Sequence, residues 1–411
     1  MKKQHHLSLF IVFSMIMVFL VLNTQMEAKA KTPTYIITPS SKPYNVTYSK
    51  YSTYNQHTKH YYVLRSYLER FEKTKGGKLI LKKGTYTISN TLYVPSNVTI
   101  QLENGAKLVK GTKTGTSQFK AASSMFQLIA PSKSGEKGVY GKYNGEKNIQ
   151  FIGKGTATID LNYVEKGIGI IMGHNQNVLV DRIQFRHMNY AHFIEMDASK
   201  NVTVKNSTFK YAKDPLISVK EAINLDTPDR STKGWSQEWS KFDAQPNSHV
   251  LIENNTFEDI PRAVGTHKYS YKKLHDRITI RQNKMVNLRS DYIRALNWSN
   301  AVIEKNTFTM SSKNKRNEVV KGIAASGTKN PIIRNNTFNY MAISMMFFTF
   351  SNTGGGTTKK VFADLSKANK EALMTNTFKN LKTPYIQIRD NIQSNGSRKT
   401  ETIRLDDSVL R

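Results

Sequence analysis

The 411-residue sequence contains no cysteine. That absence excludes disulfide bonds, thiolate metal sites and a lipoprotein anchor, so stability must come from packing of the folded chain. Histidine pairs at HxxxH spacing are also absent, which removes a common pattern for zinc. The sequence shows no helix-turn-helix, RNA-binding or zinc module, and we therefore expect no nucleic-acid partner.

Acidic residues are scarce, with 30 Asp and Glu against 61 Lys and Arg, for a formal net charge of +31. The first thirty residues contribute three positive charges and one negative, so the chain without them carries +29. Such a charge favours polyanions. The predicted partner is an acidic, uronate-containing polysaccharide or an anionic cell-wall polymer. A simpler alternative is that the charge only retains the protein at the cell wall.

The N-terminal segment is typical of a secretory signal peptide. Lys2 and Lys3 precede an apolar run over residues 7–22, and Ala28-Lys29-Ala30 forms a small-residue cleavage site. We predict cleavage after residue 30, a secreted protein that can associate with the cell wall, and no stable membrane insertion after cleavage. The oligomeric state does not follow from the sequence.

A nine-residue phrase recurs six times, at spacings of 24, 48, 28, 23 and 30 residues. Its copies are NVLVDRIQF from Asn177, NVTVKNSTF from Asn201, HVLIENNTF from His249, RITIRQNKM from Arg277, NAVIEKNTF from Asn300 and NPIIRNNTF from Asn330. Repeats at such spacings indicate a solenoid. The spacing of 48 corresponds to two rungs or to one rung with a long insertion.

Each phrase alternates apolar and polar residues, which predicts short strands with one buried face. One apolar column is Val180, Val204, Ile252, Ile280, Ile303 and Ile333, and another is Phe185, Phe209, Phe257, Met285, Phe308 and Phe338. Between them lies a column of Asn255, Asn283, Asn306 and Asn336. Asparagine tolerates left-handed backbone and can bond to the next rung, so we interpret this column as a turn ladder.

Leucine-rich, hexapeptide and helical repeats do not fit these periods, which leaves an all-β, right-handed parallel β-helix. From about Lys78 to Asn391 the chain resembles the pectin-lyase-like β-helix proteins, and KLILKKGTYTISNTLYVPSNVTIQLENGAKLV resembles their entry segment. Residues 62–75 have helical spacing at Leu64, Leu68 and Phe71 and predict an N-terminal cap helix. We divide the chain into a signal peptide (1–30), an N-terminal segment with the cap helix (31–77), the β-helix (78–350), and a C-terminal rung and cap (351–411).

A second strand follows each phrase, with Ile194, Ile223, Val264, Ile293 and Ile323 predicted to point inward. Their neighbours then form two outward columns. The first is Glu195, Asn224, Gly265, Arg294 and Ala324, and the second is Asp197, Asp226, His267, Leu296 and Ser326. Three carboxylates on adjacent rungs repel one another unless a cation or a shared proton relieves them.

The carboxylate-rich face fits two kinds of chemistry. Glu195, Asp197, Asn224 and Asp226 offer the oxygen ligands that calcium prefers. Alternatively, Asp197 and Asp226 form a carboxylate pair that hydrolyses a glycosidic bond. The order Asp, Asp, Gly-Thr-His and Tyr-Ile-Arg is similar to that of polygalacturonase-type hydrolases, although Asn224 replaces one Asp of their motif and no lysine follows Arg294 by two.

An elimination reaction needs other groups: a cation that neutralises the uronate carboxylate, a base and an acid. We assign the base to His267, Lys268 or Arg294, the acid to Tyr292, and the neutralising cation to Arg262 or a bound calcium ion. His192 and Glu221 occupy the strand-start column with Arg262 and Asp291, where an ion-pair ladder can support the site.

Two loops follow the acidic strands. The longer one, TPDRSTKGWSQEWSKFDAQPNS, carries Trp235 and Trp239, and the next, THKYSYKKLHD, carries Lys268 and Tyr269. Aromatic rings stack on sugars and lysines attract carboxylates, so we expect these loops to bind substrate and form a cleft wall.

The function that the sequence favours is secreted cleavage of an acidic polysaccharide by β-elimination. One alternative is an inverting glycoside hydrolase that uses Asp197 and Asp226. Another is a non-catalytic β-helix protein that binds the cell wall or a polysaccharide.

Overall fold

The computed structural model describes residues 32–213, 219–311, 320–351 and 359–405. The predicted signal peptide lies outside the described residues. The chain divides into two units, residues 1–33 and 34–411, and the following description concerns the second.

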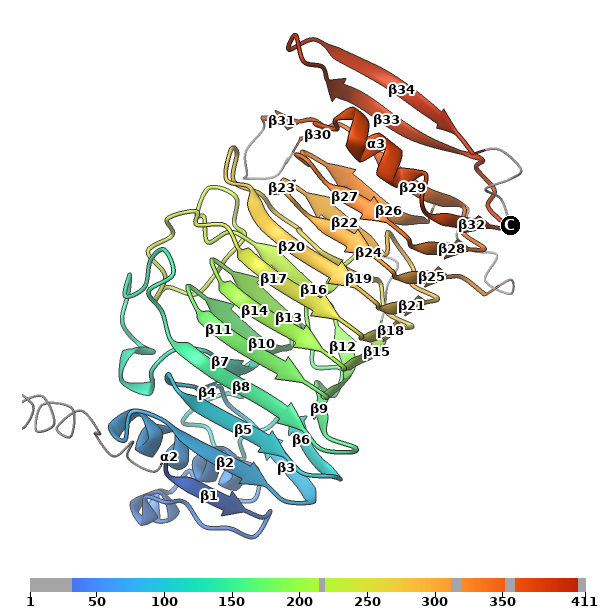
Figure 1. The fold of residues 1–411 in the computed structure, drawn as a ribbon. Helices are drawn as coiled ribbons and strands as arrows, with labels where there is room; N and C mark the ends of the chain where they lie inside the picture. The colour runs from blue at the N-terminus through green and yellow to red at the C-terminus, as the bar shows by residue number, and fades with distance from the viewer. Residues whose placement is uncertain (1–31, 214–218, 312–319, 352–358, 406–411) are drawn as a thin grey trace, which may run out of the picture. The chain divides into compact units, whose positions relative to one another are not determined.

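Three long sheets wind around one apolar core, each rung contributing a strand to each sheet (Figure 1). Sheet 1 contains, in spatial order, β1 (Thr34–Ile37), β2 (Gly77–Leu81), β5 (Val98–Leu102), β8 (Lys147–Gly153), β11 (Gln176–Asp181), β14 (Lys200–Lys205), β17 (Ser248–Glu253), β20 (His275–Arg281), β24 (Val302–Glu304) and β27 (Ile332–Arg334), with β23 (Trp298–Ser299) beside β20. Sheet 2 contains β3 (Gly84–Ile88), β6 (Ala106–Lys110), β9 (Thr158–Asp160), β12 (Gln184–Asn189), β15 (Thr208–Lys213), β18 (Thr256–Glu258), β21 (Lys284–Val286), β25 (Thr307–Thr309), β28 (Thr337–Asn339) and β32 (Thr377–Lys379).

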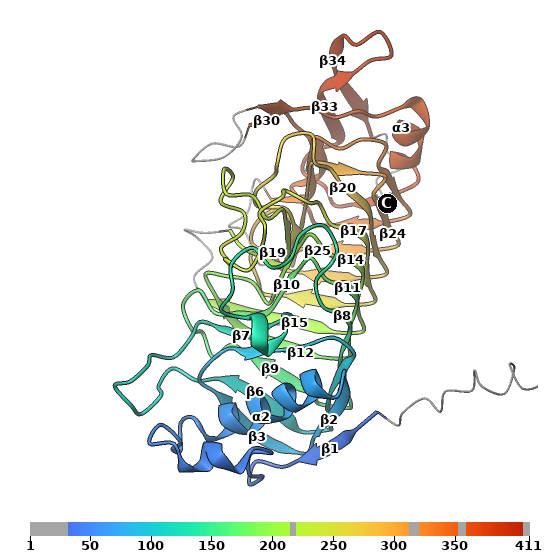
Figure 2. The same cartoon turned by 90° about the vertical axis from the view of Figure 1, so that its left-hand side faces the viewer.

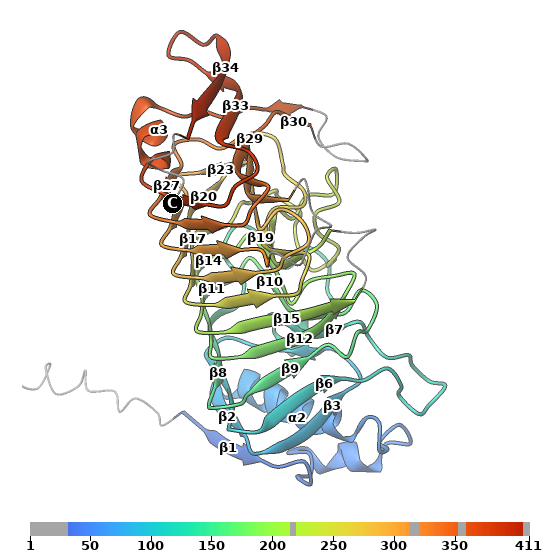
Figure 3. The same cartoon turned by 90° about the vertical axis from the view of Figure 1, so that its right-hand side faces the viewer.

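Sheet 3 carries the outward columns of acidic residues. It contains β4 (Leu92–Tyr93), β7 (Ser124–Gln127), β10 (Ile168–Gly173), β13 (Ile194–Asp197), β16 (Glu221–Asp226), β19 (Arg262–Gly265), β22 (Ile293–Leu296), β26 (Lys321–Ser326), β29 (Ile343–Phe347), β33 (Tyr385–Ile392) and β34 (Arg398–Arg404). All pairings within the three sheets are parallel except β33 with β34. This is the predicted parallel β-helix. Figure 3 shows its stacked rungs on the side of sheet 2, where β12 and β15 are labelled.

The predicted apolar columns are confirmed. Val180, Val204 and Ile252 stand opposite one another in sheet 1, and Phe185, Phe209 and Phe257 do so in sheet 2. Val202 pairs directly with Val250, so the spacing of 48 residues is one rung with a long insertion. A turn can therefore lengthen greatly without disturbing the register of the strands beneath it.

The asparagine column is a buried hydrogen-bonded ladder. The Oδ1 of Asn306 accepts from the backbone N and the Nδ2 of Asn283 at 3.0 and 2.9 Å, and its Nδ2 donates to the Ile280 carbonyl at 2.9 Å. The expectation of left-handed backbone is wrong by one position. Positive φ belongs to the residue before each ladder asparagine, for example 57° at Lys305, because the chain must turn before the side chain points inward.

The two ends of the second unit are covered differently. The cap helix α2 (Lys59–Lys73) begins three residues before the predicted start and buries Leu64, Leu68 and Phe71 against the first rungs. At the other end lie the short hairpin β30 (Phe350–Ser351) and β31 (Lys360–Val361), α3 (Lys367–Leu373), and the β33–β34 pair. Two short 3-10 helices, η1 (Val46–Lys50) and η2 (Pro131–Lys133), complete the elements. In the described part of the chain, neither α-helix is long and apolar enough to cross a membrane.

Asn306→Ala is expected to lower the free energy of unfolding by about 1–3 kcal/mol, because it removes the acceptor of the buried backbone N–H of Asn283 and a donor to the Ile280 carbonyl. The matched control is Thr307→Ala at the neighbouring exposed position, which should cost less than about 1 kcal/mol. Urea unfolding followed by circular dichroism measures both. Equal effects of the two substitutions would contradict a structural role for the ladder.

Candidate functional site

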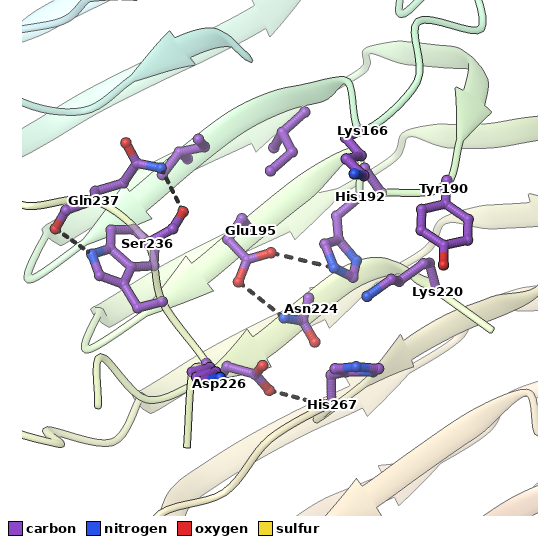
Figure 4. Close-up of a pocket in the computed structure, with 16 residues that line it drawn as sticks. Lys166, Tyr190, His192, Glu195, Lys220, Asn224, Asp226, Ser236, Gln237 and His267 are labelled. Atoms are coloured by element: carbon purple, nitrogen blue, oxygen red, sulfur yellow. Dashed lines mark hydrogen bonds and ion pairs between the residues drawn. The ribbon is translucent and has the colours of Figure 1, made fainter. Parts of the chain in front are cut away.

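A pocket of about 210 Å³ lies on the outer face of sheet 3, at β10, β13 and β16. The loops that project beside β10 and β19 in Figure 2 surround this face. Its lining includes Lys166, His192, Glu195, Lys220, Asn224, Asp226, Trp235 and His267 (Figure 4). Sequence reasoning selected these residues except Lys166 and Lys220, which lie in turns that carry no repeat signal.

The floor of the pocket follows the predicted register. Glu195 stands opposite Asn224, and Asp197 stands opposite Asp226. Asn224 is followed by Gly265 on the next rung, and Gly265 by Arg294. A Cβ on Gly265 would lie 2.9 Å from that of Arg294, so the glycine makes room for this larger neighbour.

Two neighbours hold the carboxylate of Glu195. Asn224 donates from Nδ2 to Oε1 at 3.0 Å, and the Nε2 of His192 lies 3.4 Å from Oε2. His192 is itself positioned by the backbone carbonyl of Glu221, 2.7 Å from its Nδ1. The Glu195 carboxylate is therefore fixed in orientation while it faces the pocket (Figure 4).

Asp197 and Asp226 both retain their protons more strongly than ordinary aspartates. Burial raises the pKa of Asp197 well above 3.8, and the charges of Glu195 and Asp226 raise it further. Neither Asp197 oxygen has a hydrogen-bond partner among the described residues. Burial and Glu195 likewise raise the pKa of Asp226, although its Oδ1 accepts from the backbone N of His267 and Lys268 at 2.7 and 2.8 Å. Asp197 does not line the pocket; it lies behind the two carboxyl groups that do.

Arg262 does not occupy the position predicted for a substrate-binding cation. Its guanidinium pairs with Glu221 and lies 3.3 Å from a carboxylate oxygen of Asp291, and only 2% of the side chain is exposed. Burial alone would raise the pKa of Glu221, but the charge of Arg262, followed by those of His267 and His192, lowers it to about 2. The predicted ion-pair ladder is thus present, and the guanidinium of Arg262 is fully engaged by Glu221 and Asp291.

Both tyrosines proposed from the sequence are also buried away from the pocket. Tyr292 belongs to the core and donates from its hydroxyl to the Thr309 carbonyl at 2.9 Å, and Tyr269 donates to the Lys359 carbonyl. Tyr292 precedes β22, where the chain is still turning and the two-residue alternation does not yet apply. Tyr269 is covered by Leu296, Val361 and Phe350.

The long insertion forms one wall of the pocket, as predicted, but its tryptophans do not both contact the cavity. Trp235 lines it, whereas Trp239 is buried behind and donates to Gln127 at 3.0 Å. Both indoles pack with Ile129 and Tyr140, which belong to a loop a hundred residues earlier in the chain. The insertion is therefore held in place rather than solvated.

His267 and Arg294 remain accessible on this face. The His267 side chain is 33% exposed, its Nδ1 lies 4.0 Å from Glu221, and burial lowers its pKa, so that it is neutral at pH 7. The guanidinium of Arg294 lies 4.8 Å from the ring centroid of Phe350, and its Nε has no hydrogen-bond partner in the described residues. Lys268 contributes its backbone N–H to Asp226.

The calcium expectation stays a prediction. Across the described ranges, no group of three His, Asp or Glu side chains is arranged to hold a metal ion. Glu195, Asp197 and Asp226 lie close enough to influence one another's charge, and Glu195 and Asp226 are held by hydrogen bonds from different neighbours.

Comparison with known proteins supports the fold. The family model for a right-handed β-helix region matches residues 240–362. Plasmin and fibronectin-binding protein A of Streptococcus pneumoniae is 24% identical over 259 residues, which is 58% of this chain and 35% of that protein. The chain thus spans about a third of the length of this relative.

Two solved structures of PfbA, a surface adhesin of Streptococcus pneumoniae, are also similar. One has a TM-score of 0.57 at 18% identity, covering 78% of this chain and 74% of the adhesin, and the other has a TM-score of 0.57 at 19% identity, covering 70% and 74%. At these identities the likeness shows a shared right-handed parallel β-helix.

Asp197→Asn is expected to stabilise the protein at pH 7.5, because it replaces a buried carboxyl group that ionises more readily in the unfolded chain with a neutral amide. The folded-state pKa is raised, so the wild type loses stability as the pH rises above 3.8 toward that pKa. The variant should lose less over the same window. Urea unfolding at pH 5 and pH 7.5 tests this expectation, and an unchanged dependence on pH would contradict it.

Proposed function

We propose that this pocket hydrolyses glycosidic bonds in an acidic polysaccharide, with Asp226 as the proton donor and Glu195 as the second carboxyl group. The observation that carries the proposal is the pair of carboxyl groups on adjacent rungs facing one pocket in different surroundings. Glycoside hydrolysis needs one carboxyl group that keeps its proton and one that is ionised and oriented. Asp226 has the raised pKa, and Glu195 is held by Asn224 and His192.

Asp197 has a positioning role in this scheme. Because it is fully buried beside Glu195 and Asp226, its protonation state alters the charge that both experience. A protonated Asp197 can donate to Glu195 and lessen the repulsion among the three groups. The Asp197/Asp226 pair proposed from the sequence is therefore replaced by Glu195 and Asp226.

Hydrolysis is favoured over β-elimination because two groups assigned to elimination are occupied elsewhere. Arg262 is paired with Glu221, and Tyr292 lies in the core. His267 alone could still act as a base, but an elimination also requires neutralisation of the uronate carboxylate and an acid for the leaving oxygen.

The preference for an acidic substrate rests on the cations around the pocket. Lys166, Lys220 and Lys233 line it, and Arg294 stands on the same face two rungs beyond Asn224. The net charge of +31 adds a field that attracts polyanions over a longer range. A secreted or wall-associated location suits such a substrate.

A second candidate function is adhesion without catalysis. It is supported by the name of the relative, a plasmin and fibronectin-binding protein, and by the description of PfbA as a surface adhesin. In that case the basic loops would bind a polymer or a host protein, and the carboxyl cluster would be dispensable.

Glu195→Gln and Asp226→Asn are each expected to lower reducing-end release from acidic polysaccharides by at least about 100-fold, with polymer binding retained. The control is Asp259→Asn, a turn residue with a φ of 54° that asparagine also tolerates. Ultraviolet absorbance monitors new double bonds in the same reactions. A gain in absorbance would point to elimination, and unaltered reducing-end release in the variants would contradict the assignment of these two residues. Polymer binding without any release by the wild type would favour the adhesin.

The rate of hydrolysis is expected to fall as the pH rises through the raised pKa of Asp226. The donor must be protonated, so its contribution is complete below that pKa and is lost above it. A pH–rate profile of kcat/KM on a soluble oligosaccharide measures this limb. A basic limb at the ordinary aspartate pKa near 3.8 would contradict the assignment of Asp226 as the acid.

A further inference from the structure

The outward residues of sheet 3 change from apolar to acidic between β10 and β13. On the strand preceding Glu195 and Asp197, the opposite residues are Ile171 and Gly173. Adjacent strands are about 4.8 Å apart, which is less than the width of a sugar ring. A sugar bound at Glu195 therefore spans more than one rung, and Ile171 lines the pocket on the rung next to Glu195.

Gly173 allows the apolar end of the pocket to be built. A Cβ at this position would lie 2.6 Å from the Cη2 of Trp239 and 2.8 Å from the Cζ2 of Trp235. The absence of a side chain therefore lets both indoles lie directly on the strand. Any larger residue would push the insertion away from sheet 3.

The indole N–H groups are used inside the protein. Trp235 donates to the carbonyl of Gln237 at 3.1 Å, and Trp239 donates to Gln127 at 3.0 Å. The indole N–H of Trp235 is therefore not available to a ligand in the pocket. Ile168 and Ile171 of β10 line the pocket and pack in the same apolar cluster as Trp235, whereas Ala191 lies on the rung of Glu195, and Asn224 and Asp226 lie on the next rung.

We propose that the pocket selects a sugar with a methyl-terminated substituent, whose methyl group packs on Ile171 and Trp235 while the ring meets the carboxyl groups. This inference rests on the proposed function and names the substrate more closely. An acetamido group, an O-acetyl group and the methyl of a 6-deoxy sugar share this chemistry. A substituent that ends in a hydroxyl would leave that hydroxyl against carbon without a partner, at a cost in affinity.

The test measures binding by calorimetry with the Glu195→Gln protein, so that hydrolysis does not consume the probe. Three pairs of uronate-containing hexasaccharides are compared: N-acetyl against N-formyl, O-acetyl against free hydroxyl, and 6-deoxy against 6-hydroxy. We expect the methyl-bearing member of at least one pair to bind about 10-fold more tightly, and that pair identifies the source of the methyl group.

Two substitutions locate the effect. Ile168→Thr should reduce the preference, because it places a hydroxyl in the apolar cluster of Ile171 and Trp235, and Ala191→Leu should abolish binding of the methyl-bearing member by narrowing the pocket that it lines. Ile332→Thr, on the outer face of β27 in sheet 1, should leave the preference unchanged. Circular dichroism confirms that each variant is folded.

Equal affinity within every pair, in the presence of measurable binding, overturns the inference and leaves the proposed function standing. A preference that survives both pocket substitutions also overturns it. Failure of every hexasaccharide to bind overturns the proposed function together with the inference.

Discussion

The structure depends on parallel stacking of rungs in strict register, which places each side chain directly on its counterpart one strand spacing away. Like residues suit the inside, where phenylalanines and aliphatic residues stack. Charged residues on the outside repel one another less when their signs alternate from rung to rung. At the last position of the sheet 1 strands they do so over six rungs, in the order Asp181, Lys205, Glu253, Arg281, Glu304 and Arg334. Arg281 lies 2.6 Å from Glu253 and Arg334 lies 2.9 Å from Glu304.

The candidate site departs from this alternation with buried groups. Asp197 stacks on Asp226 without an intervening cation, and both are buried beside Glu195. Five residues earlier on β16, Glu221 stands opposite Arg262 at the start of β19, and the two form a buried ion pair. The Glu221–Arg262 column is thus a buried ion pair. The Asp197–Asp226 column is a set of carboxyl groups that repel one another, and the stability of the rest of the fold must offset that repulsion.

Much of the fold could be predicted because aligning the repeated sequences gives the register of the stacked strands. The inward column and the opposition of Glu195 to Asn224 and Asp197 to Asp226 follow from alternation alone. The inward–outward alternation of side chains ends where a strand meets a turn. For this reason the sequence pattern places Tyr292 on the outer face, although it lies in the core. It also places the left-handed backbone at the ladder asparagine, although positive φ belongs to the residue before it. The ion pair of Arg262 with Glu221 and the burial of Trp239 depend on contacts between segments that are distant in the sequence. No local sequence pattern contains that information.

The terminal strand β34 has a consequence for assembly. A stack of parallel rungs presents at its end the edge onto which another parallel strand, from any molecule, can be added. β34 runs antiparallel to β33 and carries Arg398, Lys399, Glu401 and Arg404 along an edge that is mostly exposed. An approaching copy therefore meets a reversed and charged strand in place of a matching rung. The chain thereby limits its own growth into fibres.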